Sequence, residues 1–247
     1  MCVKSILSAI VAEQQLLDQY LQAIPVRNWE KTTNYMSMTI ISQVSYLAGS
    51  EDLALQSIKK KGKVFEDYKG NSGIKKFQQE QISKGTGMRH QDVIEWWRLS
   101  RAKIIELLAE SSPSRKIMWW KNEWDMQLFG LYKLTETWAH SLDIYNAVND
   151  DVEDTERLEH ISNFCWQQVE NTSRVNKIKF QDLRVELIGP GYKAWQYGDP
   201  NSSNIIKGNA GEWCRLATGR IKPKEKVSLS ATGPFAERYL KFNHPMI

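Results

Sequence analysis

Hydrophobic residues recur every three or four positions through most of the first 150 residues. This spacing gathers them on one face of an α-helix, and it predicts one short helix and four long ones. The predicted helices cover residues 3–24, 40–60, 74–82, 91–109 and 125–148. Thr39 and Asp125 each lie at the start of a long segment and are expected to act as N-caps. Four long helices with short links indicate an up-and-down four-helix bundle.

The periodicity changes near the acidic segment 149–154, which we interpret as a solvated linker. A further helix is predicted over 155–169, and then apolar and polar residues alternate as they do in strands. The predicted strands are 183–188, 193–197, 204–207 and 226–230, and the predicted helices among them are 210–217 and 235–242. The fold class is therefore predicted to be α+β, with a helical domain over 1–150 and a small α/β domain over 151–247.

The composition excludes several classes of protein. Hydrophobic residues make up 41% of the chain and charged residues 25%, as in ordinary soluble globular domains. The formal net charge of +4 is too small to indicate nucleic acid, so no nucleic-acid partner is expected. No apolar run reaches the ~20 residues that cross a membrane. The three cysteines form no CxxC motif and indicate a reducing compartment, so we expect a cytoplasmic protein.

Candidate chemistry is concentrated in the last helix of the predicted bundle. Glu136 and His140 are four residues apart and lie on one face, with Asp143 close to it. Leu128 and Tyr132 continue that face, which therefore looks toward a core. A carboxylate and an imidazole in such a place must be paired, protonated or bound to something. Two interpretations are open: a site for a divalent metal such as zinc or iron, or a hydrogen-bonded pair at a helix seam.

The string from Glu136 to Asp143, at the end of a four-helix pattern, resembles the metal-binding helix of the mycothiol-dependent maleylpyruvate isomerase family, part of the wider DinB-like superfamily. The resemblance covers nearly the whole chain. Further strings in the same order carry it: Trp96–Trp97, Arg184–Leu187, Gly208–Trp213, Ala217–Arg220 and Ala231–Arg238.

The resemblance implies a divalent metal, most simply zinc, held by Glu136, His140 and a histidine of the second helix. Tyr46 stands where that histidine is expected, and Ser42 replaces the aspartate before it. Two roles for Tyr46 follow: it ligates the metal as a phenolate, or it donates a hydrogen bond to Glu136 and replaces the metal. Asp143 either orients His140 from behind or is a surface residue.

The resemblance also implies an activity, that of a thiol-dependent isomerase or transferase. The metal-bound thiolate of a small cofactor such as mycothiol would add to an electrophilic carbon of a small-molecule substrate. Arg220 would hold a substrate carboxylate, unless it only neutralises the C-terminal end of a helix. The composition is rich in Lys, Ile and Asn, which suggests an AT-rich genome, whereas mycothiol is expected in organisms with GC-rich genomes. Another thiol, or none, therefore stays open as an alternative to mycothiol.

Two alternatives to an enzyme stay open from the sequence. The first is a non-catalytic protein that binds a small ligand and has a degenerate metal site. The second is an oligomeric scaffold that associates through its bundle faces, for example as a homodimer.

Overall fold

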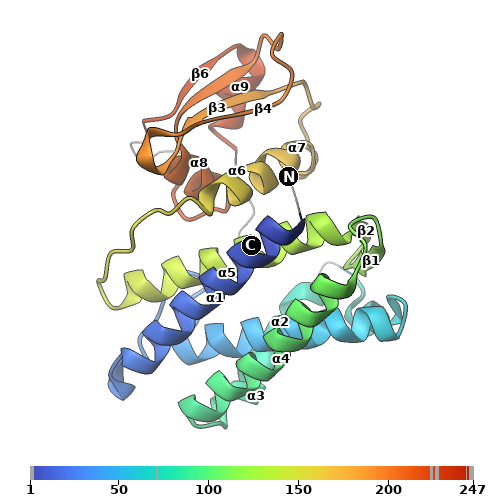
Figure 1. The fold of residues 1–247 in the computed structure, drawn as a ribbon, viewed down its shortest axis with the longest axis vertical. Coiled ribbons are helices and arrows are strands. Elements are labelled where there is room, and N and C mark those ends of the chain that lie inside the picture. Colours follow the sequence, from blue (N-terminus) through green and yellow to red (C-terminus); the bar gives the residue numbers. More distant parts are fainter. Residues whose placement is uncertain (1–2, 71, 223–224, 226–227, 243, 245–247) are drawn as a thin grey trace. The chain divides into compact units, whose positions relative to one another are not determined.

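The computed structural model describes residues 3–70, 72–222, 225, 228–242 and 244. The chain divides into two compact units, residues 1–151 and 152–247. The first unit is mainly helical, and the second contains a four-stranded sheet with helices (Figure 1). The predicted α+β fold class is confirmed.

The first unit contains the helices that the hydrophobic periodicity predicts. They are α1 (Val3–Ala23), α2 (Ile40–Lys59), α3 (Gly73–Thr86), α4 (His90–Glu110) and α5 (Met126–Ala147), with 3₁₀ turns at Val26–Asn28 and Lys63–Tyr68. Helix α2 packs against α4 and α3, and α1 packs against α5 and α4. The Thr39 and Asp125 side chains accept hydrogen bonds from the first turns of α2 and α5, so both predicted N-caps are confirmed.

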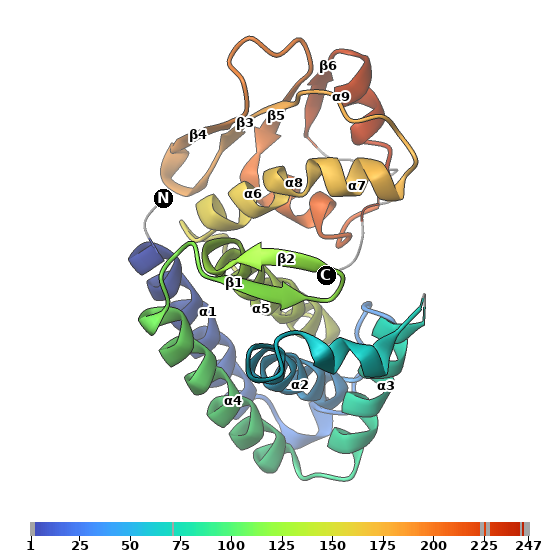
Figure 2. The same ribbon diagram turned by 90° about the vertical axis from the view of Figure 1, so that its right-hand side faces the viewer.

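A β-hairpin precedes α5 where the sequence predicted only a tryptophan-rich connection. Strands β1 (Lys116–Trp119) and β2 (Asn122–Asp125) pair in antiparallel register (Figure 2). Ile117 and Trp119 are buried, whereas the residues between and after them are more exposed. Four-residue strands give too short an alternation to be recognised in a sequence, so this element escaped prediction.

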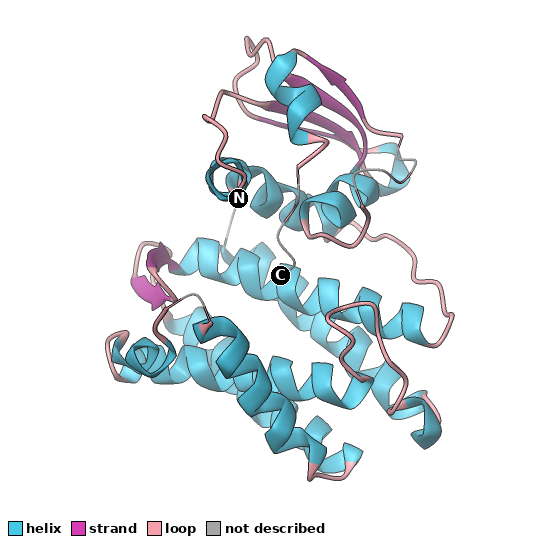
Figure 3. Cartoon of the chain, turned by 180° about the vertical axis from the view of Figure 1, so that it is seen from behind, coloured by secondary structure: helices cyan, strands magenta, loops and turns pink. Residues whose placement is uncertain are grey.

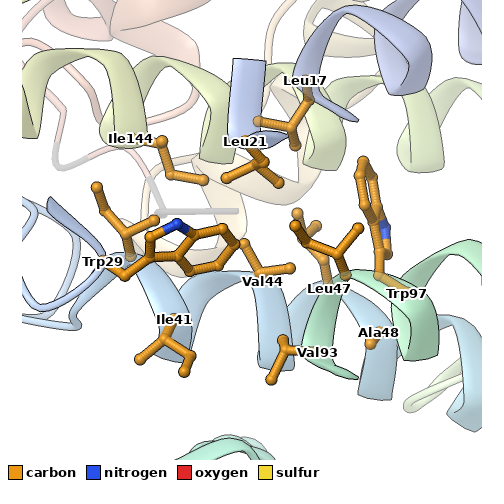
Figure 4. Close-up of a cluster of buried hydrophobic side chains, with 12 residues drawn as sticks. Leu17, Leu21, Trp29, Ile41, Val44, Leu47, Ala48, Val93, Trp97 and Ile144 are labelled. Carbon is orange, nitrogen blue, oxygen red and sulfur yellow. The ribbon is translucent and has the colours of Figure 1, made fainter. Parts of the chain in front are cut away.

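The core of the first unit joins four helices. Its buried side chains meet between α1, α2, α4 and α5, and Trp29 from the connection after α1 closes one end (Figure 4). The members are Leu17, Leu21, Trp29, Ile40, Ile41, Val44, Leu47, Ala48, Val93, Ile94, Trp97 and Ile144. Burial of this apolar surface holds α2 against α5, the two helices that carry the candidate site.

The second unit is built on a sheet with strand order β4-β3-β5-β6. Strands β3 and β4 form an antiparallel hairpin, β3 and β5 are parallel, and β5 and β6 are antiparallel. Helices α6 and α8 pack against each other and against the sheet (Figure 3). The elements are α6 (Leu158–Gln167), α7 (Val169–Val175), β3 (Arg184–Ile188), β4 (Ala194–Tyr197), β5 (Ile205–Asn209), α8 (Ala210–Ala217), β6 (Ser230–Thr232) and α9 (Pro234–Tyr239), with a 3₁₀ turn at Pro190–Tyr192.

Some element boundaries of the second unit differ from the prediction. The helix predicted over 155–169 begins at Leu158 and is interrupted at Gln168, where α7 follows. The last strand is at 230–232 instead of 226–230, because its partner β5 pairs Ile206 with Ala231; residues 226 and 227 lie outside the described part of the chain. Gly219 closes α8, with a φ of 75° after the end of that helix.

Replacing a buried leucine and an exposed leucine of the first unit should change the free energy of unfolding by different amounts. Leu47→Ala removes a side chain that is 0% exposed and should lower the free energy of unfolding by about 2–5 kcal/mol. Leu99→Ala, at a side chain that is 55% exposed on α4, should change it by less than about 0.5 kcal/mol. Urea unfolding of both variants checks this. Equal effects would place Leu47 outside the core.

Candidate functional site

Helix α5 brings Glu136 and His140 into the interior of the first unit, as the helical spacing predicted. Both side chains are fully buried. The Glu136 carboxylate accepts a hydrogen bond from Tyr132 one turn earlier, at 2.7 Å, and from the Ser50 hydroxyl of α2, at 2.9 Å. The Tyr46 hydroxyl, also from α2, lies 3.4 Å from Glu136 Oε1 and donates to it. The structure therefore joins α2 to α5 through Glu136.

A lysine that the sequence analysis did not select occupies the centre of this cluster. Lys133 is 0% exposed, and its Nζ lies 2.5 Å from Glu136 Oε2 and 3.1 Å from Glu51 Oε2. Its ammonium also donates to the Ser50 hydroxyl at 3.1 Å. Burial lowers the pKa of Lys133, but the carboxylates of Glu136 and Glu51 raise it by more, so the pKa lies above its usual value. Lys133 is therefore a charged ammonium buried between two carboxylates.

His140 belongs to a second group of polar side chains beside the first. Its Nδ1 lies 3.0 Å from Gln43 Oε1 and 3.7 Å from an Asp143 oxygen. The amide oxygen of Gln43 can only accept, and its Nε2 donates to Thr33, so His140 Nδ1 carries the proton. In this tautomer the lone pair is on Nε2. Asp143 is only 2% exposed, so it is not a surface residue and is placed to support His140.

The side chains at this position do not fit a divalent metal. Structural and catalytic zinc sites use three or four protein ligands, and no group of three His, Cys, Asp or Glu side chains that could hold a metal occurs among the described residues. The Glu136 carboxylate is already neutralised by Lys133, whose charge repels a second cation. Burial, followed by the Glu136 charge, raises the pKa of Tyr46 well above its usual value, so Tyr46 is a neutral phenol and not a phenolate ligand. Of the two roles expected for Tyr46, the structure shows the hydrogen bond to Glu136.

Arg220 lies in the second unit, just after α8. One of its guanidinium nitrogens donates to the Thr218 carbonyl at 2.8 Å, at the C-terminal end of that helix. This contact is the helix-end interaction that the sequence left open as an alternative to substrate binding. Two other histidines lie away from Glu136. His90 begins α4 and packs against Trp29, and His160 lies in α6 of the second unit.

Sequence reasoning missed Lys133, Ser50, Glu51 and Gln43. A charged residue within a helix is normally solvated, and nothing in the composition marks these as buried. A signal did exist: Lys133 precedes Glu136 by three positions and Ser50 follows Tyr46 by four, so each shares a helix face with a candidate residue.

Comparison of the sequence with known proteins finds distant relatives of nearly the same length. No protein-family model matches the sequence. Two uncharacterized proteins from two strains of Mycobacterium tuberculosis are each 24% identical over 232 residues, which is 93% of this chain and 90% of theirs. No helix among the described residues is long and apolar enough to cross a membrane.

Solved structures give the class of fold. The crystal structure of the mycothiol-dependent maleylpyruvate isomerase superposes with a TM-score of 0.62 at 13% identity, over 94% of this chain and 93% of that one. A histidine-to-alanine mutant of a mycothiol-dependent maleylpyruvate isomerase superposes with a TM-score of 0.61 at 14% identity, over 90% of each chain. The chain thus has the fold of mycothiol-dependent maleylpyruvate isomerase, as the sequence resemblance predicted.

The buried carboxylates predict a dependence of stability on pH. Burial raises the pKa of Glu51 to about 7, although the Lys133 ammonium acts in the opposite direction. Glu51 is therefore protonated at a higher pH in the folded chain than in the unfolded chain, and its contribution to stability is lost as the pH rises from about 4.5 to about 7. Relative to Glu51→Gln, the wild type should lose about 3 kcal/mol over that interval, measured by urea unfolding at each pH.

The matched control for this prediction is Glu106→Gln, at an exposed carboxylate of α4. It should leave the pH profile of the wild type unchanged. A Glu51→Gln profile parallel to that of the wild type would show that Glu51 titrates normally in the folded protein.

Proposed function

We propose that this chain is a thiol-dependent isomerase or transferase that acts on a small electrophilic molecule. The observation that carries this proposal is the likeness to mycothiol-dependent maleylpyruvate isomerase over nine-tenths or more of both chains. The cofactor is a low-molecular-weight thiol, with mycothiol as the first candidate. The proposed reaction uses no zinc, because the side chains around Glu136 do not fit a zinc ion.

Without a metal, a side-chain base must deprotonate the thiol, and His140 is the best placed. Its Nδ1 proton is held by Gln43, so Nε2 is the nitrogen that accepts a proton. The thiolate sulfur then bonds to the electrophilic carbon of the substrate, and the electron pair of the attacked double bond moves to the adjacent carbon. Rotation about the new single bond and loss of the thiolate restore the double bond, and the thiolate regains its proton from His140. A transferase would stop at the adduct, after the adjacent carbon takes the proton back from His140 Nε2.

This mechanism requires movement of side chains around His140. The imidazole is fully buried, and the rings of Tyr35 and Tyr46 lie 4.7 and 5.2 Å from it. A thiol reaches Nε2 only when such neighbours shift. Arg220 remains the proposed group for a substrate carboxylate, since its planar guanidinium can bind a carboxylate through two parallel hydrogen bonds.

Turnover with a thiol tests the proposal. The purified chain is incubated with maleylpyruvate and either mycothiol, glutathione or cysteine, in the presence of EDTA. Turnover should require one of the thiols and should persist in EDTA. His140→Gln should lower kcat/KM by about 100-fold or more, the usual contribution of a general base. The histidine control His90→Gln should retain wild-type activity.

Absence of turnover with every thiol would argue against the proposed function, and loss of turnover in EDTA would argue against its metal-free form. An active His140→Gln variant would remove His140 as the base.

The role of Arg220 is tested separately. Arg220→Lys keeps the charge but loses the bidentate geometry, so KM for a carboxylate substrate should rise about tenfold while kcat changes little. If Arg220 only stabilises the end of α8, the variant should lower the melting temperature and leave KM unchanged.

One observation argues for a non-catalytic protein, and binding of a small ligand is the second function considered for it. Both oxygens of Glu136 are engaged by neighbouring side chains, and the cluster around it is buried. Such a cluster can hold α2 against α5 as a purely structural feature, with no catalytic role. A thermal shift produced by the substrate, with no product formed at any thiol concentration, would favour this function over the first.

A further inference from the structure

Lys133 carries the only buried ammonium among the buried residues that the structure describes, and it lies at the carboxylate that a metal would need. Three oxygens from two helices surround its nitrogen: Glu136 Oε2 at 2.5 Å, Glu51 Oε2 at 3.1 Å and Ser50 Oγ at 3.1 Å. All four side chains are less than 2% exposed. A nitrogen with such oxygen partners is coordinated much as a bound cation would be.

The charge of the cluster explains why a cation is needed there. Glu136 and Glu51 come from α5 and α2, and both are 0% exposed. Two uncompensated carboxylates inside a helical unit would be strongly destabilising. Tyr132, Tyr46 and Ser50 supply hydrogen bonds to Glu136 but no positive charge. Lys133 is the positive charge in contact with both carboxylates.

We propose that the Lys133 ammonium is a built-in substitute for the divalent metal expected at Glu136 and His140, and that it excludes such a metal from this site. Two changes act together in the proposal. Tyr46 stands where the resemblance places a histidine and donates to Glu136, and Lys133 neutralises the Glu136 carboxylate. The inference holds whether or not the thiol chemistry proposed above is correct.

Zinc binding by a Tyr46→His variant distinguishes exclusion of the metal by Lys133 from simple loss of a histidine ligand. If Tyr46 alone prevented metal binding, Tyr46→His would restore it. If Lys133 excludes the metal, Tyr46→His should bind zinc no better than the wild type. The double variant Tyr46→His/Lys133→Met, which supplies a third ligand and removes the ammonium, should bind about one zinc per chain.

The experiment measures zinc rather than activity. Each protein is purified without a histidine tag, equilibrated with zinc and analysed by isothermal titration and elemental mass spectrometry. Zinc affinity of the double variant should exceed that of Tyr46→His at least about 100-fold, and zinc should raise its melting temperature by about 5 °C or more. Lys103→Met, at an exposed lysine of α4, replaces Lys133→Met as the matched control and should gain nothing.

Loss of folding in the double variant does not remove the test. Adding Glu51→Gln to it eliminates one of the two carboxylates that lose their counter-charge, and that triple variant is measured in the same way. The wild type gives a separate answer, since neither zinc nor EDTA should change its melting temperature.

Three results would overturn the inference. The first is tight zinc binding by Tyr46→His alone. The second is stoichiometric zinc in the wild type that disappears in Glu136→Gln. The third is a folded double variant that binds no zinc, because Lys133 would then not be what keeps the metal out.

Discussion

The contact of one buried ammonium with two buried acidic side chains is the constraint on which the first unit depends. Glu136 of α5 and Glu51 of α2 both contact Lys133, so the ion cluster joins the two helices that form the candidate site. Removing one partner of a buried ion pair commonly costs about 3–5 kcal/mol, because the other charge is left unpaired. The hydrogen bonds from Ser50 and Tyr132 complete the cluster, and they make Glu136 a structural anchor before any chemistry is considered.

The side chains of this cluster show why the function of the chain does not follow from its fold alone. Structural similarity at 13–14% sequence identity shows the fold of the chain. The chemistry must be argued from the side chains at the site. Here those side chains differ from a metal centre in two respects, the neutral phenol of Tyr46 and the ammonium of Lys133. In the proposed mechanism the proton is transferred by His140, which contacts Gln43 and Asp143. A thiol-dependent reaction in this chain would thus use an imidazole base where a metal was expected.

The sequence predicted the helices well because their apolar positions repeat over many turns, and Thr39 and Asp125 marked two helix starts correctly. It missed the hairpin β1–β2, whose strands are only four residues long. At the site, spacing along one helix was enough to bring Glu136 and His140 to one buried face. Contacts between helices could not be predicted from the sequence, because periodicity does not show which residue of α2 faces Glu136. A buried lysine also cannot be distinguished from a solvated one in the sequence, since some of its partners come from another helix.

A crystal structure from zinc-containing crystals, with anomalous data collected at the zinc edge, tests the central claim most directly. We predict the Lys133 ammonium in contact with Glu136 and Glu51, and no anomalous peak beside Glu136 or His140. A zinc ion about 2.0–2.2 Å from a Glu136 oxygen and a His140 nitrogen, with the Lys133 side chain turned away, would contradict the account.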